Sequence, residues 1–150
     1  MDIKAIVSDL CKEHDTRNPF DLAASLGVIV LHEPLGEIQG FYHCCYRQQF
    51  IHINEKLDGY EALFTCAHEV GHSILHQGIN TPFLRKHTLF SVAKIETEAD
   101  RFALELLFDD EELLPFLTRS ITDAAAFMGM PERLAEYRIR SIPRKIILYP

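Results

Sequence analysis

The stretch FTCAHEVGHSILHQ, residues 64–77, decides how the rest of the sequence is interpreted. It contains His68, Glu69 and His72 in the order H-E-x-x-H, within a segment that is typical of an α-helix. Residues four apart on a helix share a face, about 5–6 Å apart at Cβ, so both histidines can bind one metal ion. Glu69 projects about 100° further round the helix, where it can contact a metal-bound water without being a ligand. The motif therefore predicts a metal site with a general base beside it.

A catalytic zinc site needs a third protein ligand and keeps one position for water. A metzincin would continue the motif with glycine and histidine at positions that are Leu75 and Gly78 here, so that class is excluded. His76 lies about 12 Å along the helix axis from His68, which is too far for the same ion. It is expected to be a helix-end histidine or one that orients a ligand.

The segment ETEAD, residues 96–100, supplies better candidates for the third ligand. Glu96 and Asp100 share one face of the next predicted helix, so Glu96 can bind the metal while Asp100 accepts the N–H of a ligand histidine. Glu98 is expected to be solvated and remains the alternative ligand. The expected cofactor is one Zn²⁺ ion, although the same ligands could hold Mn or Fe.

The sequence before the motif predicts two helices followed by a small sheet. Apolar spacing and bounding Pro and Gly residues indicate helices in IKAIVSDL (3–10) and NPFDLAASLG (18–27). Three strand-like segments follow, VIVLHE (28–33), IQGFYHCCY (38–46) and QFIHIN (49–54). Because no helix separates them, we expect an α+β fold with a three-stranded, mainly antiparallel sheet.

The second half of the chain predicts helices only. The H-E-x-x-H helix is expected to begin at Asp58 and stop at Gly78, and the next helix covers KIETEADRFALELLF (94–108). Two shorter helices fit SITDAAAFMG (120–129) and PERLAEYRIR (131–140).

A chain of 150 residues is expected to form a single domain. Within 1–150 we distinguish N-terminal helices and sheet (1–57), catalytic helices (58–110) and a C-terminal helical segment (111–150). No apolar run reaches the roughly 20 residues of a membrane span, and charges interrupt the N-terminus, unlike in a signal peptide. The expected location is the cytoplasm, without a membrane partner.

The net charge is −7, from 22 acidic and 15 basic residues. This balance argues against a large nucleic-acid-binding surface, which would be basic. Basic residues do gather in 131–150, where a solvated helix face is favoured over a binding patch. The four cysteines form no C-x-x-C motif and are expected to be reduced, partly buried thiols.

Two segments of this chain together resemble the ImmA/IrrE family of zinc metallopeptidases: FIHINEKLDGYEALFTCAHEVGHSILH (50–76) and ETEADRFALELLF (96–108). The resemblance extends over roughly residues 20–140. It implies a small sheet packed on the active-site helix and a gluzincin-like site. In that site zinc is held by His68, His72 and Glu96, and Glu69 is the general base.

The sequence departs from the family pattern in two places. Family members often have Asn where Asp100 stands. They also usually have a proline soon after the Leu-Leu pair of the third-ligand helix. Here that segment reads LLFDDEELLP (106–115), so the loop after this helix is expected to differ.

The resemblance implies a zinc-dependent endopeptidase whose protein substrate is a helix-turn-helix repressor of a prophage or mobile element. The helices at 120–129 and 131–140 themselves resemble a helix-turn-helix. With a net charge of −7, packing on the core or docking a repressor is favoured over direct nucleic-acid binding. The alternative function is a non-catalytic, zinc-containing regulatory adaptor that binds a repressor or another transcription regulator. Three ligands rather than four favour catalysis.

Substrate uptake and stabilisation of the oxyanion leave alternatives open. The strand before the active helix in such folds commonly binds substrate by strand addition, although a plain strand is an equal reading. The residues of that candidate strand are Phe50, Ile51, His52 and Ile53. A second oxyanion donor is also expected beside the metal. The candidates are His76, His87 and Tyr137.

Overall fold

The computed structural model describes residues 1–79 and 89–143 and confirms the α+β class. The chain divides into two compact units, Met1–Leu107 and Phe108–Pro150. The single domain expected over 1–150 stays a prediction. Within the described part of the chain, every helix is too short or too polar to cross a membrane.

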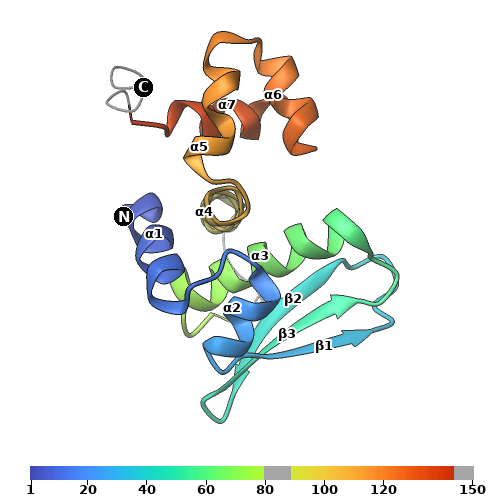
Figure 1. Ribbon diagram of the computed structural model, residues 1–150. Coiled ribbons are helices and arrows are strands. Elements are labelled where there is room, and N and C mark those ends of the chain that lie inside the picture. Colours follow the sequence, from blue (N-terminus) through green and yellow to red (C-terminus); the bar gives the residue numbers. More distant parts are fainter. Residues whose placement is uncertain (80–88, 144–150) are drawn as a thin grey trace. The chain divides into compact units, whose positions relative to one another are not determined.

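Within its described residues, the first unit holds a three-stranded sheet and four helices that lie on one side of it (Figure 1). Helix α3 lies between the sheet and α4, so the helix with the H-E-x-x-H motif is central in this unit. The elements in chain order are α1 (Ile3–His14), α2 (Pro19–Ser25), β1 (Ile29–Glu33), β2 (Gly40–Cys45), β3 (Gln48–Asn54), α3 (Gly59–Leu75) and α4 (Leu89–Leu107).

The boundaries of α3 differ slightly from the sequence-based expectation. The helix begins at Gly59, directly after Asp58, but the Asp58 side chain makes no capping hydrogen bond. It ends at Leu75 rather than running to Gly78, and His76 is its C-cap with non-helical backbone angles. His76 thus closes the last turn by donating its backbone N–H to the His72 carbonyl, while its own backbone leaves the helical conformation.

The sheet is mixed, with strand order β1-β3-β2, which corrects the expectation of a mainly antiparallel sheet. Strands β2 and β3 are antiparallel because the tight turn at Tyr46 and Arg47, both with positive φ, reverses the chain. Strand β1 runs parallel to β3, because the segment 34–39 crosses over the end of β3 before β2 begins. The Asn54 side chain holds this crossing by donating to the carbonyls of Gly36 and Ile38, each at 2.9 Å.

This topology also corrects the substrate strand expected at Phe50–Ile53. Strand β3 is the central strand and pairs with a neighbour along each edge, so it has no edge free for a substrate. Ile51 and Ile53 are fully buried under α3, and the alternation of a strand places Phe50 and His52 on the opposite face. There the ring of His52 contacts Glu33 and His43.

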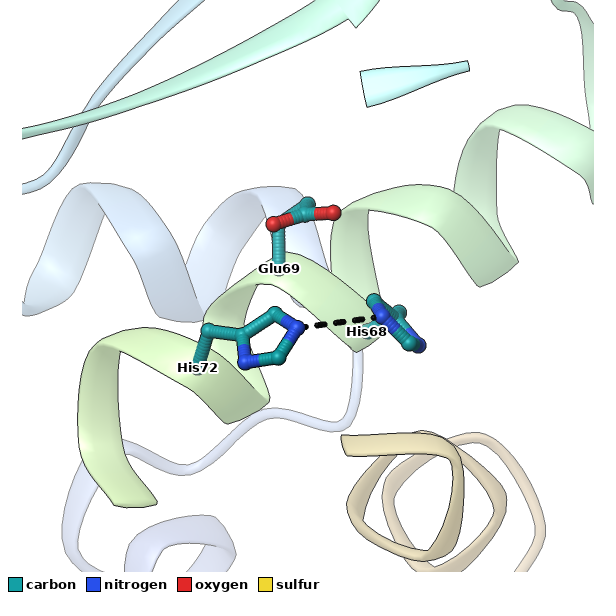
Figure 2. A group of neighbouring side chains, drawn as sticks. All are labelled: His68, Glu69 and His72. Atoms are coloured by element: carbon teal, nitrogen blue, oxygen red, sulfur yellow. Dashed lines mark hydrogen bonds between the residues drawn. The ribbon is translucent and has the colours of Figure 1, made fainter. Parts of the chain in front are cut away.

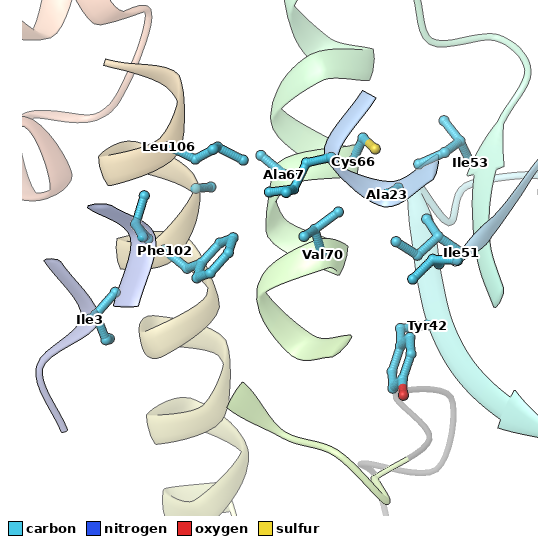
Figure 3. Close-up of a cluster of buried hydrophobic side chains, with 14 residues drawn as sticks. Ile3, Ala23, Tyr42, Ile51, Ile53, Cys66, Ala67, Val70, Phe102 and Leu106 are labelled. Atoms are coloured by element: carbon cyan, nitrogen blue, oxygen red, sulfur yellow. The ribbon is translucent and has the colours of Figure 1, made fainter. Parts of the chain in front are cut away.

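The hydrophobic core of the first unit lies where the sheet, α3 and α4 meet (Figure 3). Cys66 contributes to this core, and burial raises the pKa of its thiol to about 12, so it is an inert packing residue. All four cysteines are free thiols; Cys11 and Cys44 are partly buried as expected, whereas Cys45 is exposed. The other buried side chains include Ile3, Val7, Leu22, Tyr42, Ile51, Ile53, Val70, Phe102 and Leu106.

Gly40 begins β2 where the backbone of β3 and helix α3 come very close. A Cβ atom at Gly40 would lie 2.7 Å from the backbone oxygen of His52 and 2.8 Å from Thr65 Cγ2. We expect Gly40→Ala to lower the free energy of unfolding by about 1–3 kcal/mol, because the overpacked strand must shift. Urea denaturation measures this, with the exposed neighbour Gln39 as control: Gln39→Ala should stay within about 0.5 kcal/mol of wild type. Equal stability of the two variants would contradict the prediction.

The second unit consists of α5 (Asp110–Leu113), the 3₁₀ helix η2 (Leu114–Thr118), α6 (Ile121–Met128) and α7 (Glu132–Arg140). The segment that departs from the family pattern forms the start of this unit, where Asp109 and Glu112 make a capping box. The basic residues of segment 131–150 were expected to form a solvated helix face, but they are not all exposed. Arg138 is buried, ion-pairs with Asp110 at 2.8 Å and donates to the Phe108 carbonyl.

Candidate metal centre

Helix α3 presents His68, Glu69 and His72 from two successive turns (Figure 2). The Nε2 atoms of His68 and His72 lie 3.2 Å apart. Glu69 leaves the helix in a different direction from the two rings, as Figure 2 shows, yet one of its oxygens stays within 4.8 Å of a nitrogen of each histidine. The arrangement has the geometry that the H-E-x-x-H spacing predicts.

Glu96 on α4 faces both of these histidines. Its two carboxylate oxygens lie 3.0 Å from His68 Nε2 and 3.1 Å from His72 Nε2. Two ligands of a tetrahedral zinc ion with bonds of 2.0–2.1 Å lie about 3.3 Å apart. The three side chains therefore surround one point at the separation that a metal ion requires.

Asp100, one turn after Glu96, accepts a hydrogen bond from His68 Nδ1 at 2.9 Å. Burial works against the cationic form of His68, but the hydrogen bonds to Asp100 and Glu96 outweigh it and raise its pKa to about 10. Burial likewise opposes ionisation of Glu96, yet its hydrogen bonds with the two histidines hold its pKa well below the usual range. Negative charge that favours a proton at this point also favours a divalent cation.

His72 differs from His68 because it is fully buried. Burial lowers the pKa of His72, so its ring is neutral at neutral pH. A neutral imidazole is the form that binds a metal ion.

Glu69 is buried, and its Oε2 atom has no hydrogen-bond partner among the residues that the structure describes. Burial raises its pKa to about 7, which is the range that suits a general base at neutral pH. An unsatisfied buried carboxylate oxygen is costly and calls for an explanation. A water or substrate N–H beside the three converging ligands would satisfy it. The donor set and this orphaned oxygen together fit a divalent metal ion.

A cleft of about 240 Å³ opens onto these groups within the first unit. Strand β2 supplies one wall through Gly40, together with the preceding Gln39. Helices α3 and α4 supply the rest of the lining, namely Phe64, Thr65, His68, Glu69, Glu96 and Asp100. The proposed base and two of the three converging side chains, His68 and Glu96, thus line a cleft.

His76 and Glu98 lie behind His72. His76 Nδ1 lies 2.9 Å from His72 Nδ1, and His76 Nε2 lies 3.1 Å from Glu98 Oε1. The expectation that Glu98 is solvated is wrong, since its side chain is 15% exposed and faces His76. The four-residue spacing of His72 and His76 was a signal for this contact, but their pairing with Glu98 depends on how α4 packs.

The three candidates for the oxyanion donor lie in different parts of the chain. His76 has both ring nitrogens engaged, by His72 and Glu98. His87 lies outside the described residues. Tyr137 is on α7 of the second unit, and its role stays a prediction.

Comparison with known proteins agrees with the class of protein that this fold and site define, a metallopeptidase. The family model for the IrrE N-terminal-like domain, Peptidase_M78, matches residues 14–140. The chain is 31% identical over 146 residues to Metallopeptidase ImmA of Bacillus subtilis (strain 168), covering 93% of this chain and 85% of ImmA. It is also 42% identical over 139 residues to "Uncharacterized immunity region protein 2" of Bacillus phage phi105, covering 91% and 88% of the two chains.

The chain therefore belongs to the IrrE N-terminal-like Peptidase_M78 family.

Proposed function

We propose that this protein is a zinc-dependent endopeptidase that cleaves a helix-turn-helix repressor of a prophage or mobile element. The observation that carries the proposal is the convergence of His68, His72 and Glu96 beside the unsatisfied Oε2 of Glu69. Two histidines and one glutamate, with a position left for water, form a ligand set of catalytic zinc sites.

The side chains of the site divide the chemistry between them. When bound, zinc supplies an acidified water and a Lewis acid for the scissile carbonyl. Glu69 accepts the proton of the attacking water at Oε2 and then delivers it to the leaving nitrogen. Asp100 holds His68 by accepting its Nδ1–H, which leaves Nε2 of that ring for the metal.

Strand addition of the substrate is available at β2. This strand pairs with β3 along one edge only within the described residues, and its first residue, Gly40, lines the cleft. An extended peptide along the other edge of β2 would gain main-chain hydrogen bonds and pass Glu69.

The proposed target comes from similarity rather than from geometry. The family resemblance implies a repressor substrate, and the similar protein of phage phi105 is named as an immunity region protein. A non-catalytic adaptor would need no unpaired carboxylate beside its metal, and a closed structural site usually has four protein ligands. Both points favour the peptidase.

The direct test incubates the purified, zinc-loaded chain with candidate helix-turn-helix repressors of prophages or mobile elements. We expect cleavage of one bond, identified by mass spectrometry, and loss of cleavage after zinc is removed with a chelator. Restoring zinc should restore the activity. If the repressor stays intact while binding the chain tightly, the adaptor function replaces the peptidase.

A further inference from the structure

We propose that Glu98, acting through His76, positions the metal ligand His72. The two residues form a relay with His72, defined as His72–His76–Glu98, that fixes which nitrogen of His72 faces the metal. The inference rests on the metal site of the proposed function but assigns roles to two residues outside its ligand set.

The first step concerns the proton of His72. The Nε2 atom of His72 faces Glu96 Oε1 and His68 Nε2, the other two proposed ligand groups. For a metal to bind between them, this Nε2 must carry a lone pair and no proton. The single proton of the neutral ring must then sit on Nδ1. That Nδ1 lies 2.9 Å from His76 Nδ1, which makes His76 the acceptor.

The second step concerns the proton of His76. Because its Nδ1 accepts from His72, the proton of the neutral His76 ring sits on Nε2 and is donated to Glu98 Oε1 at 3.1 Å. A carboxylate accepts hydrogen bonds and cannot donate them. Glu98 therefore excludes the other tautomer of His76, in which Nδ1–H would drive the His72 proton onto Nε2 and block the metal.

The surroundings make this relay effective. His72 and His76 are buried, and the Glu98 side chain is 15% exposed, so water competes little for these hydrogen bonds. The other histidine ligand, His68, donates its Nδ1–H directly to the carboxylate of Asp100. Helix α4 thus orients both ligand histidines, one in direct contact and the other through an intervening imidazole. Such partners of ligand histidines are worth about 10–100-fold in metal affinity.

The test measures zinc affinity of the full-length chain by competition with a chelating dye, without any substrate. We expect Glu98→Ala to weaken zinc binding by about 10–100-fold. Glu98→Gln should retain most of the affinity, because its amide oxygen still accepts from His76. The matched control is Glu105→Ala on the same helix. Glu105 is buried and ion-pairs with Lys4 at 3.1 Å, so this variant should lose stability but keep the wild-type zinc affinity.

A double-mutant cycle tests whether Glu98 acts through His76. Glu98→Ala should have no further effect on zinc affinity in a His76→Ala background. In ¹⁵N NMR spectra of the zinc-loaded wild type, His76 should be protonated at Nε2 and not at Nδ1, and Glu98→Ala should lose this fixed tautomer.

Wild-type zinc affinity in Glu98→Ala, additive effects in the cycle, or a His76 proton on Nδ1 would overturn the relay. Failure of the proposed function is distinguishable, since a chain without peptidase activity would still show these effects on zinc binding.

Discussion

Glu69→Gln is expected to lower the rate of peptide hydrolysis by about 100- to 10,000-fold, the usual contribution of a general base. The amide keeps the size of the carboxylate but cannot accept the proton of the attacking water. Zinc affinity should stay close to that of wild type, because Glu69 is not among the three proposed ligands. The turnover rate of the zinc-loaded variant on a cleaved repressor peptide, compared with its zinc content, measures both effects.

The stability of the same variant provides the control against unfolding. Burial raises the pKa of Glu69 from 4.5 to about 7, so the native state binds this proton more tightly than the unfolded state. The stability of the metal-free wild type should therefore fall as the pH rises from about 4.5 to about 7, and Gln lacks this penalty. Above pH 7 the variant should gain stability relative to wild type. If Glu69→Gln hydrolysed the peptide at the wild-type rate, Glu69 would not be the general base.

Glu96→Gln is expected to lower zinc affinity by at least about 100-fold. A zinc-binding free energy of about 10–16 kcal/mol shared among three or four ligands assigns about 2.5–5 kcal/mol to each, and the middle of that range corresponds to roughly 100- to 1,000-fold. The loss is expected because the amide removes the negative charge that faces His68 and His72. Chelator competition measures the affinity, and cobalt substitution with visible spectroscopy reports the change in ligand set.

Glu98→Gln is the matched comparison, because it changes the same chemical group two residues away. Its zinc affinity should fall by less than about tenfold, since loss of an orienting partner costs less than loss of a ligand. If Glu98→Gln releases zinc more readily than Glu96→Gln, the third ligand is Glu98 and the assignment must change.

The sequence was sufficient for those parts of the fold and site that depend on local periodicity. The four-residue spacing of His68 and His72, and that of Glu96 and Asp100, follows directly from the helical repeat. The two pairs belong to one site only because α3 and α4 pack together. That packing was anticipated from the combination of motifs rather than from either one alone.

The features that sequence reasoning missed depend on non-local contacts. The parallel pairing of β1 with β3 follows from a crossing that Asn54 holds in place, and no local pattern in the strands predicts it. The burial of Glu98 was missed because it follows from the packing of α4 against His76. Helix α3 also ends at Leu75, before the glycine that marked its expected end.

Gly71, between Glu69 and His72, has a consequence for the dimensions of the metal site. A Cβ atom at this position would lie 3.1 Å from Cβ and Cγ of Phe102 on α4, so the two helices approach as closely as they do because residue 71 has no side chain. The same interhelical distance sets how far Glu96 must reach to meet the two histidines. The glycine of H-E-V-G-H thus helps to set the distance between the two helices, and with it the separation of Glu96 from His68 and His72.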